Sequence, residues 1–325
     1  MNWFDETFGF KELNYDKTRS KFLEIFYKEN SKKLNNINIG EFCLFNNFFL
    51  KSNINFCTIG NLKIQNIVSD IRNIHYNYKN STIQVASQLN CLEMINPFIC
   101  PENGITIYSQ DNTQGPICSL CCPAGLAYRN YIYNSGQTRN KQICLLRESM
   151  EYLKSIDNNI NYNIINGYLL LSNNNDLIRI NLLLDNAIIN ENFKQLIKSG
   201  SHSNQEVIVN GKKLDHCVNH VYCSGIPINY NDTISDKTLW LKLSLVWLEA
   251  MYENTLLIAY KNNYLSRLNE PCFLTKIGGG VFGMDDNIII LSINNAIKFM
   301  RKHQIFLDVY IVHYGNLDLR YNSII

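Results

Sequence analysis

The chain has 325 residues, of which 46% are hydrophobic and 18% are charged, and its formal net charge is +2. This composition can build an ample core, and the near-neutral charge without a long basic block argues against a nucleic-acid partner. The sequence contains neither a run of about 18 apolar residues nor the basic and apolar regions of a signal peptide. We therefore expect a globular cytoplasmic protein that does not enter a membrane, with its cysteines reduced.

The predicted elements alternate between strands and helices. In chain order, after a polar N-terminal segment, we expect a strand at residues 42–50, a helix at 62–78, a strand at 82–86, turns at 97–115, helices at 116–133 and 145–156, a strand at 167–171, a helix at 177–197, strands at 206–209 and 218–223, a helix at 236–264, a strand at 271–277, a helix over 288–299 and a strand at 306–312.

This alternation predicts an α/β fold in which helices cover both faces of a mixed, largely parallel sheet. We expect residues 1–50 to form an N-terminal extension that packs on or flanks the core, and residues 51–325 to form the main domain. In such sheets a ligand lies beyond the carboxyl ends of the strands. The loops at 87–94, 102–115 and 278–286 are therefore expected to meet around one site.

A glycine-rich segment lies between the strand expected at 271–277 and the following helix. Its residues are Gly278, Gly279, Gly280, Val281, Phe282 and Gly283. Glycines here let backbone N–H groups approach a phosphate closely, at the positive end of the helix behind them. The segment therefore predicts a phosphate-bearing ligand.

Two carboxylates, Asp285 and Asp286, follow this glycine loop. They would repel a phosphate if they only bound it, so we expect them to face another part of the ligand and to take part in chemistry. The alternative is that Asp286 caps the following helix, with Asp285 as its neighbour in the first turn.

A second candidate anion site lies where residues 111–116 enter a helix. Asp111, Thr113, Gln114 and Gly115 precede a proline there, a pattern typical of a helix N-terminus. Together with the glycine loop, this terminus could hold a diphosphate. The alternative is that Thr113 or Asn112 only caps the helix.

Several ordered segments carry a resemblance to a known family. They are residues 84–94, 101–106 with Tyr108, 111–116, 128–131, 221–224 with Pro227, and 274–286. In these segments the chain resembles the macrodomain superfamily of ADP-ribose-binding proteins. In particular, it is similar to an atypical branch that includes arginine-specific ADP-ribosylhydrolases of the MavL type. The segments extend over most of the chain, from about residue 64 to residue 315.

The resemblance implies a three-layer α/β/α macrodomain-like domain that binds ADP-ribose, needs no cofactor and acts as a monomer on an ADP-ribosylated protein. It implies that the glycine loop holds the diphosphate and the distal ribose. Asn90 and Glu93 would lie near a ribose, while Asp111, Asp285 and Asp286 would surround the scissile bond. The chain departs from the family pattern by having only Asn90 of an expected asparagine pair, and Met284 in place of an asparagine.

The acids suit hydrolysis of an ADP-ribosyl–arginine bond. A carboxylate can stabilise the positive charge that develops at the anomeric carbon and orient the attacking water, and a second acid can hold the guanidinium. We expect Asp285 or Asp286 to position the water and Asp111 or Glu93 to hold the substrate.

Other roles stay open at this point. Glu93 could lie at an exposed helix start, and Asp111 could be a turn residue. The whole site could bind ADP-ribose without turnover, as a reader module, or hydrolyse poly(ADP-ribose) or another ADP-ribose ester.

Cysteines and histidines gather at two places without predicting a metal site. Cys118 and Cys121 have a Cys-x-x-Cys spacing, but they lie in an apolar helix without a second pair at zinc-ribbon spacing. Residues 216–223 alternate like a strand, which places the histidines and the cysteines of that segment on opposite faces. We expect no bound metal.

Overall fold

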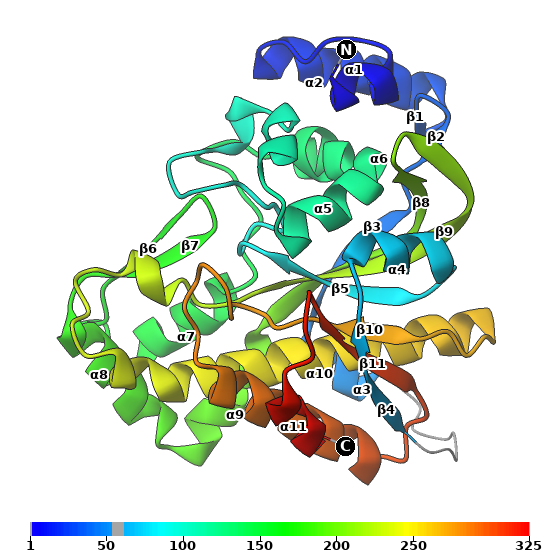
Figure 1. Cartoon of the computed structure of the whole chain (residues 1–325). Coiled ribbons are helices and arrows are strands. Elements are labelled where there is room, and N and C mark those ends of the chain that lie inside the picture. Colours follow the sequence, from blue (N-terminus) through cyan, green and yellow to red (C-terminus); the bar gives the residue numbers. More distant parts are fainter. Residues whose placement is uncertain (1, 54–61, 325) are drawn as a thin grey trace.

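The computed structural model describes residues 2–53 and 62–324. Its centre is a seven-stranded mixed sheet with the order β3-β8-β9-β5-β10-β11-β4 (Figure 1). The strands are β3 (Glu41–Asn46), β4 (Lys63–Val68), β5 (Thr82–Ser87), β8 (Lys198–Val209), β9 (Lys212–Ser224), β10 (Cys272–Leu274) and β11 (Asp308–His313). β8 runs antiparallel to both of its neighbours, whereas the joins from β9 to β4 are parallel.

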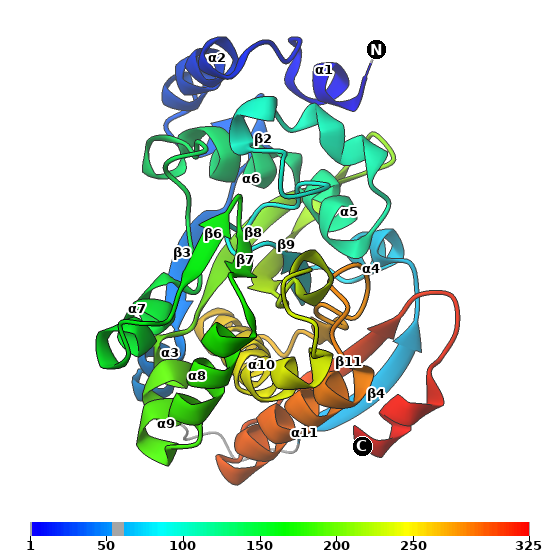
Figure 2. The same cartoon turned by 90° about the vertical axis from the view of Figure 1, so that its left-hand side faces the viewer.

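Helices cover both faces of this sheet. They are α3 (Asn47–Ser52), α4 (Ile71–Asn77), α5 (Gln114–Cys121), α6 (Pro123–Ala127), α7 (Arg147–Ile156), α8 (Asn174–Leu184), α9 (Ala187–Leu196), α10 (Trp240–Ser266) and α11 (Asp286–Lys302). α4, α5 and α6 lie on one face, and α3, α10 and α11 lie on the other (Figures 1 and 2). The predicted three-layer α/β/α class is therefore confirmed. Within the described residues, no helix is long and apolar enough to cross a lipid bilayer.

The N-terminal helices α1 (Trp3–Phe8) and α2 (Tyr15–Lys28) form a further layer above α5 and α6 (Figure 1). The ring of Phe22 packs 5.2 Å from that of Tyr131. Between the two helices, the Glu12 carboxylate accepts hydrogen bonds from the Tyr131 hydroxyl and from the N–H groups of Ile105 and Thr106. The N-terminal layer thus fixes the segment that leads to Asp111.

Two expected elements differ from the structure at a position where a polar side chain caps a helix. The helix expected at 62–78 is instead strand β4 followed by α4, because residues 63–68 pair with β11 and Asp70 caps α4. The strand expected at 42–50 stops at Asn46, which caps α3. The isoleucines at intervals of three or four fit a helix, but pairing with β11, which is distant in sequence, makes residues 63–68 a strand.

Two expected helices are interrupted. The helix expected at 116–133 breaks at Cys122, which has non-helical dihedrals before Pro123, and it continues as α6 and a π-helical turn at Tyr128–Ile132. The helix expected at 177–197 divides into α8 and α9, where Asn186 caps the second helix. Between α7 and α8, a small hairpin pairs β6 (Tyr162–Ile165) with β7 (Tyr168–Leu171).

β8 and β9 form a hairpin much longer than the expected strands at 206–209 and 218–223. Asn210 and Gly211 connect them, both with positive φ. This is the backbone that a two-residue hairpin turn requires, and an Asn-Gly pair adopts it readily. The hairpin carries the sheet from its parallel half to β3, so residues 41–46 of the N-terminal segment complete the sheet edge.

A buried ion cluster joins α3, α9 and α10 on the lower face. The Glu253 carboxylate is almost fully buried and accepts from Lys194 at 2.7 Å and from Lys51 at 3.0 Å. Burial alone would raise the pKa of Glu253, but the two lysines outweigh it and hold this pKa below its usual value. Glu253 therefore stays ionised inside the fold, and the cluster depends on its lysines.

The substitution Lys194→Met is expected to lower the free energy of unfolding by about 2–3 kcal/mol. This is less than the roughly 3–5 kcal/mol for a buried charge that loses its only partner, because Lys51 remains. The difference from wild type should shrink as the pH falls, because without Lys194 the Glu253 carboxylate takes up a proton more readily than in the wild type, which relieves the poorly paired charge in the variant. Urea unfolding at pH 7 and pH 4 measures this. Lys212→Met, at an exposed lysine of β9, is the control, and an equal loss in both variants would contradict the prediction.

Candidate functional site

One cavity opens at the carboxyl ends of β5, β9 and β10. These strands run parallel, so the chain after Ser87, Ser224 and Leu274 leaves the same edge of the sheet. The space between the loops is about 820 Å³, including a part open to solvent. This space lies at the position where open α/β sheets bind their ligands.

The crevice exists because β10 pairs with β5 only at Thr82 and Ile83. Beyond them, the side chain of Gln114 takes the place of a strand. Its Oε1 accepts from the N–H of Ala86 at 2.9 Å, and its Nε2 donates to the carbonyl of Gln84 at 2.8 Å. The backbone of β5 is thus satisfied while the sheet parts.

The N-terminus of α5 forms one wall of the cavity. Thr113, Gln114 and Gly115 line it, and a Cβ on Gly115 would lie 1.9 Å from the Ala86 carbonyl oxygen. Only glycine therefore allows this approach. Thr113 occupies the cap position, but its side chain makes no capping bond. Helix capping by Thr113 thus does not explain this residue.

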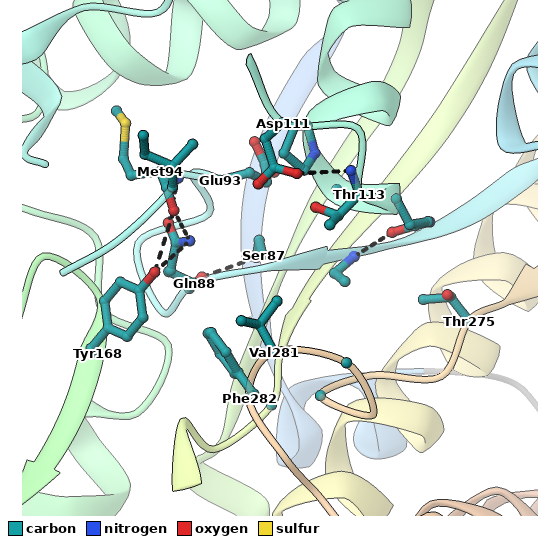
Figure 3. Close-up of a pocket in the computed structure, with 18 of the residues that line it drawn as sticks. Ser87, Gln88, Glu93, Met94, Asp111, Thr113, Tyr168, Thr275, Val281 and Phe282 are labelled. Atoms are coloured by element: carbon teal, nitrogen blue, oxygen red, sulfur yellow. Dashed lines mark hydrogen bonds between the residues drawn. The ribbon is translucent and has the colours of Figure 1, made fainter. Parts of the chain in front are cut away.

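The glycine loop forms the opposite wall, as Figure 3 shows for Val281 and Phe282 facing Asp111 and Thr113. Gly278 has a φ of +76°, and a Cβ there would lie 2.5 Å from the sulfur of Met284. Gly278, Gly280, Val281 and Phe282 line the cavity.

Internal hydrogen bonds close this loop. The N–H of Met284 donates to the Gly278 carbonyl, and the N–H of Gly283 donates to that of Gly280. Among the described residues, the N–H groups of Gly280, Val281 and Phe282 have no acceptor. Consecutive free N–H groups of this kind form an anion-binding nest.

Met284, the departure from the expected asparagine, has a structural reason. Its side chain is buried under Gly278, and its sulfur accepts the N–H of Ile226 at 3.3 Å. It therefore braces the glycine loop against the loop that follows β9. Gly279 and Gly283 support the turn but do not line the cavity, and Gly283 packs on Asn229.

Glu93 is a buried carboxylic acid in the cavity wall, not an exposed residue at a helix start. Its Oε2 accepts from the hydroxyl of Ser119 at 2.9 Å, and its N–H donates to the hydroxyl of Tyr108 at 2.8 Å. Its Oε1 has no partner among the described residues. Burial raises the pKa of Glu93 to about 7, although the Arg129 charge and the hydrogen bonds with Ser119 and Tyr108 oppose the rise.

Asp111 lies at the rim of the same wall, beside Glu93 in Figure 3. Its Oδ1 accepts from the N–H of Thr113 at 2.8 Å, which is the turn geometry that the sequence allowed. This turn orients the carboxylate without excluding it from the cavity. The wall thus presents one buried acid and one accessible acid.

Tyr168, Tyr230 and Lys276 also line the cavity, and the sequence analysis did not name them as site residues. Tyr168 and Tyr230 pack with Phe282 as an aromatic wall, with ring centroids 5.1 to 5.9 Å apart. Lys276 lies just before the glycine loop and forms an ion pair with Asp318 at 3.3 Å. The tyrosines come from β7 and from the loop after β9, so no local sequence motif indicates that they lie at the site.

Asp285 and Asp286 lie outside the cavity lining, contrary to the sequence expectation. Asp285, rather than Asp286, caps α11 by accepting from the N–H groups of Asn287 and Ile288. Asp286, in the first turn of the helix, pairs with Arg320 at 2.6 Å. Both carboxylates are therefore held by cationic or N–H groups and are not among the residues that line the cavity.

Asn90, which was expected near a ribose, has its side chain held by hydrogen bonds within the protein. It is fully buried, its Oδ1 accepts from the N–H of Leu92, and its Nδ2 donates to Gln142. It therefore shapes the turn between β5 and Glu93 and is not among the lining residues.

One cluster in the described part of the chain could hold a metal ion. It comprises His75, Cys122 and His220, all buried, with ligand atoms within 4.8 Å of one another. Hydrogen bonds satisfy the imidazoles without an ion. The Nδ1 of His75 donates to the Ile71 carbonyl, so its Nε2 accepts from the Nε2 of His220, whose Nδ1 accepts from Tyr222. Burial lowers the pKa of both histidines, which keeps them neutral as this chain requires.

Comparison with known proteins finds no matching protein-family model and no matching curated protein. Similar solved structures include poly(ADP-ribose) glycohydrolase from Deinococcus radiodurans in complex with ADP-ribose, at 8% identity and a TM-score of 0.45, over 87% of this chain and 90% of that chain. Another is poly(ADP-ribose) glycohydrolase from Thermomonospora curvata, at 8% identity and a TM-score of 0.41, over 91% and 92%. Similarities this distant assign no activity to the chain, so its function has to follow from the cavity.

Two glycines of the loop make a matched test of its geometry. Gly278→Ala is expected to lower the melting temperature by several degrees, because the new Cβ would collide with Met284 at a positive φ. Gly280→Ala is expected to leave the melting temperature within about 1 °C, because its Cβ would meet open space. Differential scanning calorimetry measures both. Equal shifts would mean that the loop does not have this conformation.

Proposed function

We propose that the protein is a macrodomain-like ADP-ribosylhydrolase that removes ADP-ribose from arginine side chains. One observation carries this proposal: the same cavity has an anion-receptive wall and a wall with two carboxylates. A ligand that fits both carries phosphates at one end and a positive charge at the other. ADP-ribosyl-arginine has this pattern.

The glycine loop supplies the anion-receptive wall. The free N–H groups of Gly280, Val281 and Phe282 can donate to the oxygens of a diphosphate, and Lys276 adds a positive charge nearby. The aromatic wall of Tyr168, Tyr230 and Phe282 offers apolar surface to a ribose or a base.

The acid wall supplies the chemistry. In the proposed reaction, the carboxylate of Asp111 holds the guanidinium and stabilises positive charge at the anomeric carbon as the C–N bond breaks. Water attacks that carbon, and Glu93 takes its proton at Oε1. Glu93 then returns the proton to the departing guanidine, which leaves as a guanidinium. This replaces the sequence expectation that Asp285 or Asp286 positions the water.

Glu93→Gln and Asp111→Asn are each expected to lower the rate of ADP-ribose release from an arginine-modified peptide by about 10²–10⁴-fold. Each keeps the shape of the side chain, so ADP-ribose binding by calorimetry should change little. Asp286→Asn, at a residue outside the cavity lining, discriminates the two assignments, and Glu24→Gln on α2 is the exposed control. A loss in Asp286→Asn as large as in Glu93→Gln would restore the sequence assignment.

Substrate linkage is tested with the wild-type protein. We expect release from arginine-linked ADP-ribose to exceed release from carboxylate-ester-linked ADP-ribose and from poly(ADP-ribose), because two acids favour a cationic leaving group. Chromatography of free ADP-ribose measures all three. Tight binding of ADP-ribose without release from any substrate would instead establish a reader module, and preferential cleavage of the polymer would establish the other hydrolase.

The rate should rise with pH through about 7 and level off above it. The raised pKa of Glu93 means that it is protonated, and unable to accept a proton, below this range. A profile of kcat/KM from pH 5.5 to 9 measures this rising limb of the pH–rate curve, and Glu93→Gln should abolish the rise. A rate that falls across the same range would assign Glu93 the role of an acid instead.

A further inference from the structure

Arg129 is a buried cation that has no carboxylate partner in the described part of the chain. Its side chain is fully buried, and no acid of the described residues lies within ion-pair distance of it. The guanidinium donates to the Cys91 carbonyl at 3.0 Å, to the Ser119 hydroxyl at 2.9 Å and to Nδ1 of His202 at 3.2 Å, and lies over the Tyr222 ring. Burying such a charge costs several kcal/mol, so its retention calls for a role.

We propose that Arg129 is a positioning residue for Glu93, acting through Ser119 to direct proton exchange to Oε1. This inference rests on the proposed function, because it concerns the acid that accepts a proton there. It assigns Arg129 no contact with the substrate.

The direction of the hydrogen bonds follows from the donors. A guanidinium can only donate, so the Ser119 oxygen accepts from Arg129 and its single proton points to Oε2 of Glu93. Oε2 is therefore an acceptor in either protonation state. The proton that Glu93 gains or loses must sit on Oε1, the buried oxygen that has no hydrogen-bond partner among the described residues.

Arg129 also holds the backbone that carries Glu93. Cys91 lies two residues before Glu93, has a φ of +58° that side-chain-bearing residues rarely adopt, and receives the Arg129 bond at its carbonyl. Lysine could keep the charge, but it lacks the planar fork that reaches Cys91, Ser119 and His202 together.

Groups from several elements influence the titration of Glu93. Arg129 and the hydrogen bonds with Ser119 and Tyr108 favour the charged form, while burial and Asp111 oppose it. The buried thiols of Cys91 and Cys118 and the Tyr222 hydroxyl also face Glu93, and burial raises the pKa of each, so they stay neutral. The relay from Arg129 through Ser119 to Glu93 thus contributes most to stabilising the ionised carboxylate.

The test follows the titration of Glu93 directly, by NMR of protein labelled with carbon-13 at glutamate carboxyls, with Glu93→Gln identifying the signal. Ser119→Ala is expected to move the titration midpoint and the pH–rate limb upward together by about one pH unit, making the rate at pH 6 about tenfold lower. Ser149→Ala removes an equally buried serine hydroxyl in α7, and should move neither.

Arg129→Lys should raise the midpoint as well, and Ser119→Ala added to it should raise it little further, because both belong to one relay. An unmoved midpoint in Ser119→Ala, or shifts that add fully in the double variant, would overturn the proposal. Circular dichroism and ADP-ribose binding identify a variant that has lost its fold, in which case Ser119→Cys supplies the comparison. The titration needs no substrate, so a shifted midpoint without ADP-ribose release would sink the proposed hydrolase and keep the relay.

Discussion

The side-chain amide of Gln114, bound to the backbone of β5, is the interaction on which the site depends. Parallel strands that stay paired to their ends leave no crevice between them. Here β10 leaves β5 after two residue pairs, and the amide satisfies the carbonyl of Gln84 and the N–H of Ala86 that would otherwise be unpaired. The same contact fixes the start of α5 against β5, where Gly115 permits the approach. The same contact therefore opens the sheet and places the wall of the cavity.

Glu93 and Arg129 show what such a wall demands of the core behind it. Either charge alone would be expensive among apolar groups, and the two do not form a direct ion pair. The serine between them transmits part of the attraction, and the other carboxylate oxygen has no hydrogen-bond partner among the residues that the structure describes. A direct bidentate pair would be more stabilising, but it would occupy both oxygens. The Ser119 hydroxyl between the two charges thus gives a weaker interaction than a direct ion pair, but it leaves Oε1 of Glu93 available to carry a proton.

Several features were predictable because their signals are local. The strand at 82–86 and the long helix α10 follow from apolar runs and periodicity, and the glycine loop follows from its composition. The entry to α5 at 111–116 was also identified from turn residues. Two of these segments, the glycine loop and the entry to α5, form facing walls of the cavity, which is why the sequence located the site.

Other features depend on contacts that are distant in sequence. Residues 63–68 form a strand because β11, more than 240 residues later, supplies the pairing. Asn210 and Gly211 are a local signal for the turn between β8 and β9, but the extent of these strands depends on their pairing with each other and with β3 and β5. Asn46, Asp70 and Asn186 each cap a helix, but asparagine and aspartate are equally common in turns, so they did not mark boundaries unambiguously.

The acids after the glycine loop show why the site was harder to predict than the fold. Carboxylates beside a phosphate cradle would repel the anion, and the sequence argument resolved this by turning them toward the reacting bond. The structure resolves it by neutralisation. Asp285 accepts the first N–H groups of α11, and Asp286 pairs with Arg320, which also binds Asp318.

Asp318 in turn pairs with Lys276 in the cavity lining. The charges therefore alternate from Asp286 through Arg320 and Asp318 to Lys276. The last member of this series, the cation Lys276, lies next to the glycine loop. Arg320 and Asp318 lie at the C-terminal end of the sequence, so no spacing around the loop could reveal this arrangement. Because opposite charges hold Asp286 and Asp318, neither acid opposes an anion at the loop, and the carboxylates left for chemistry are those of the other wall.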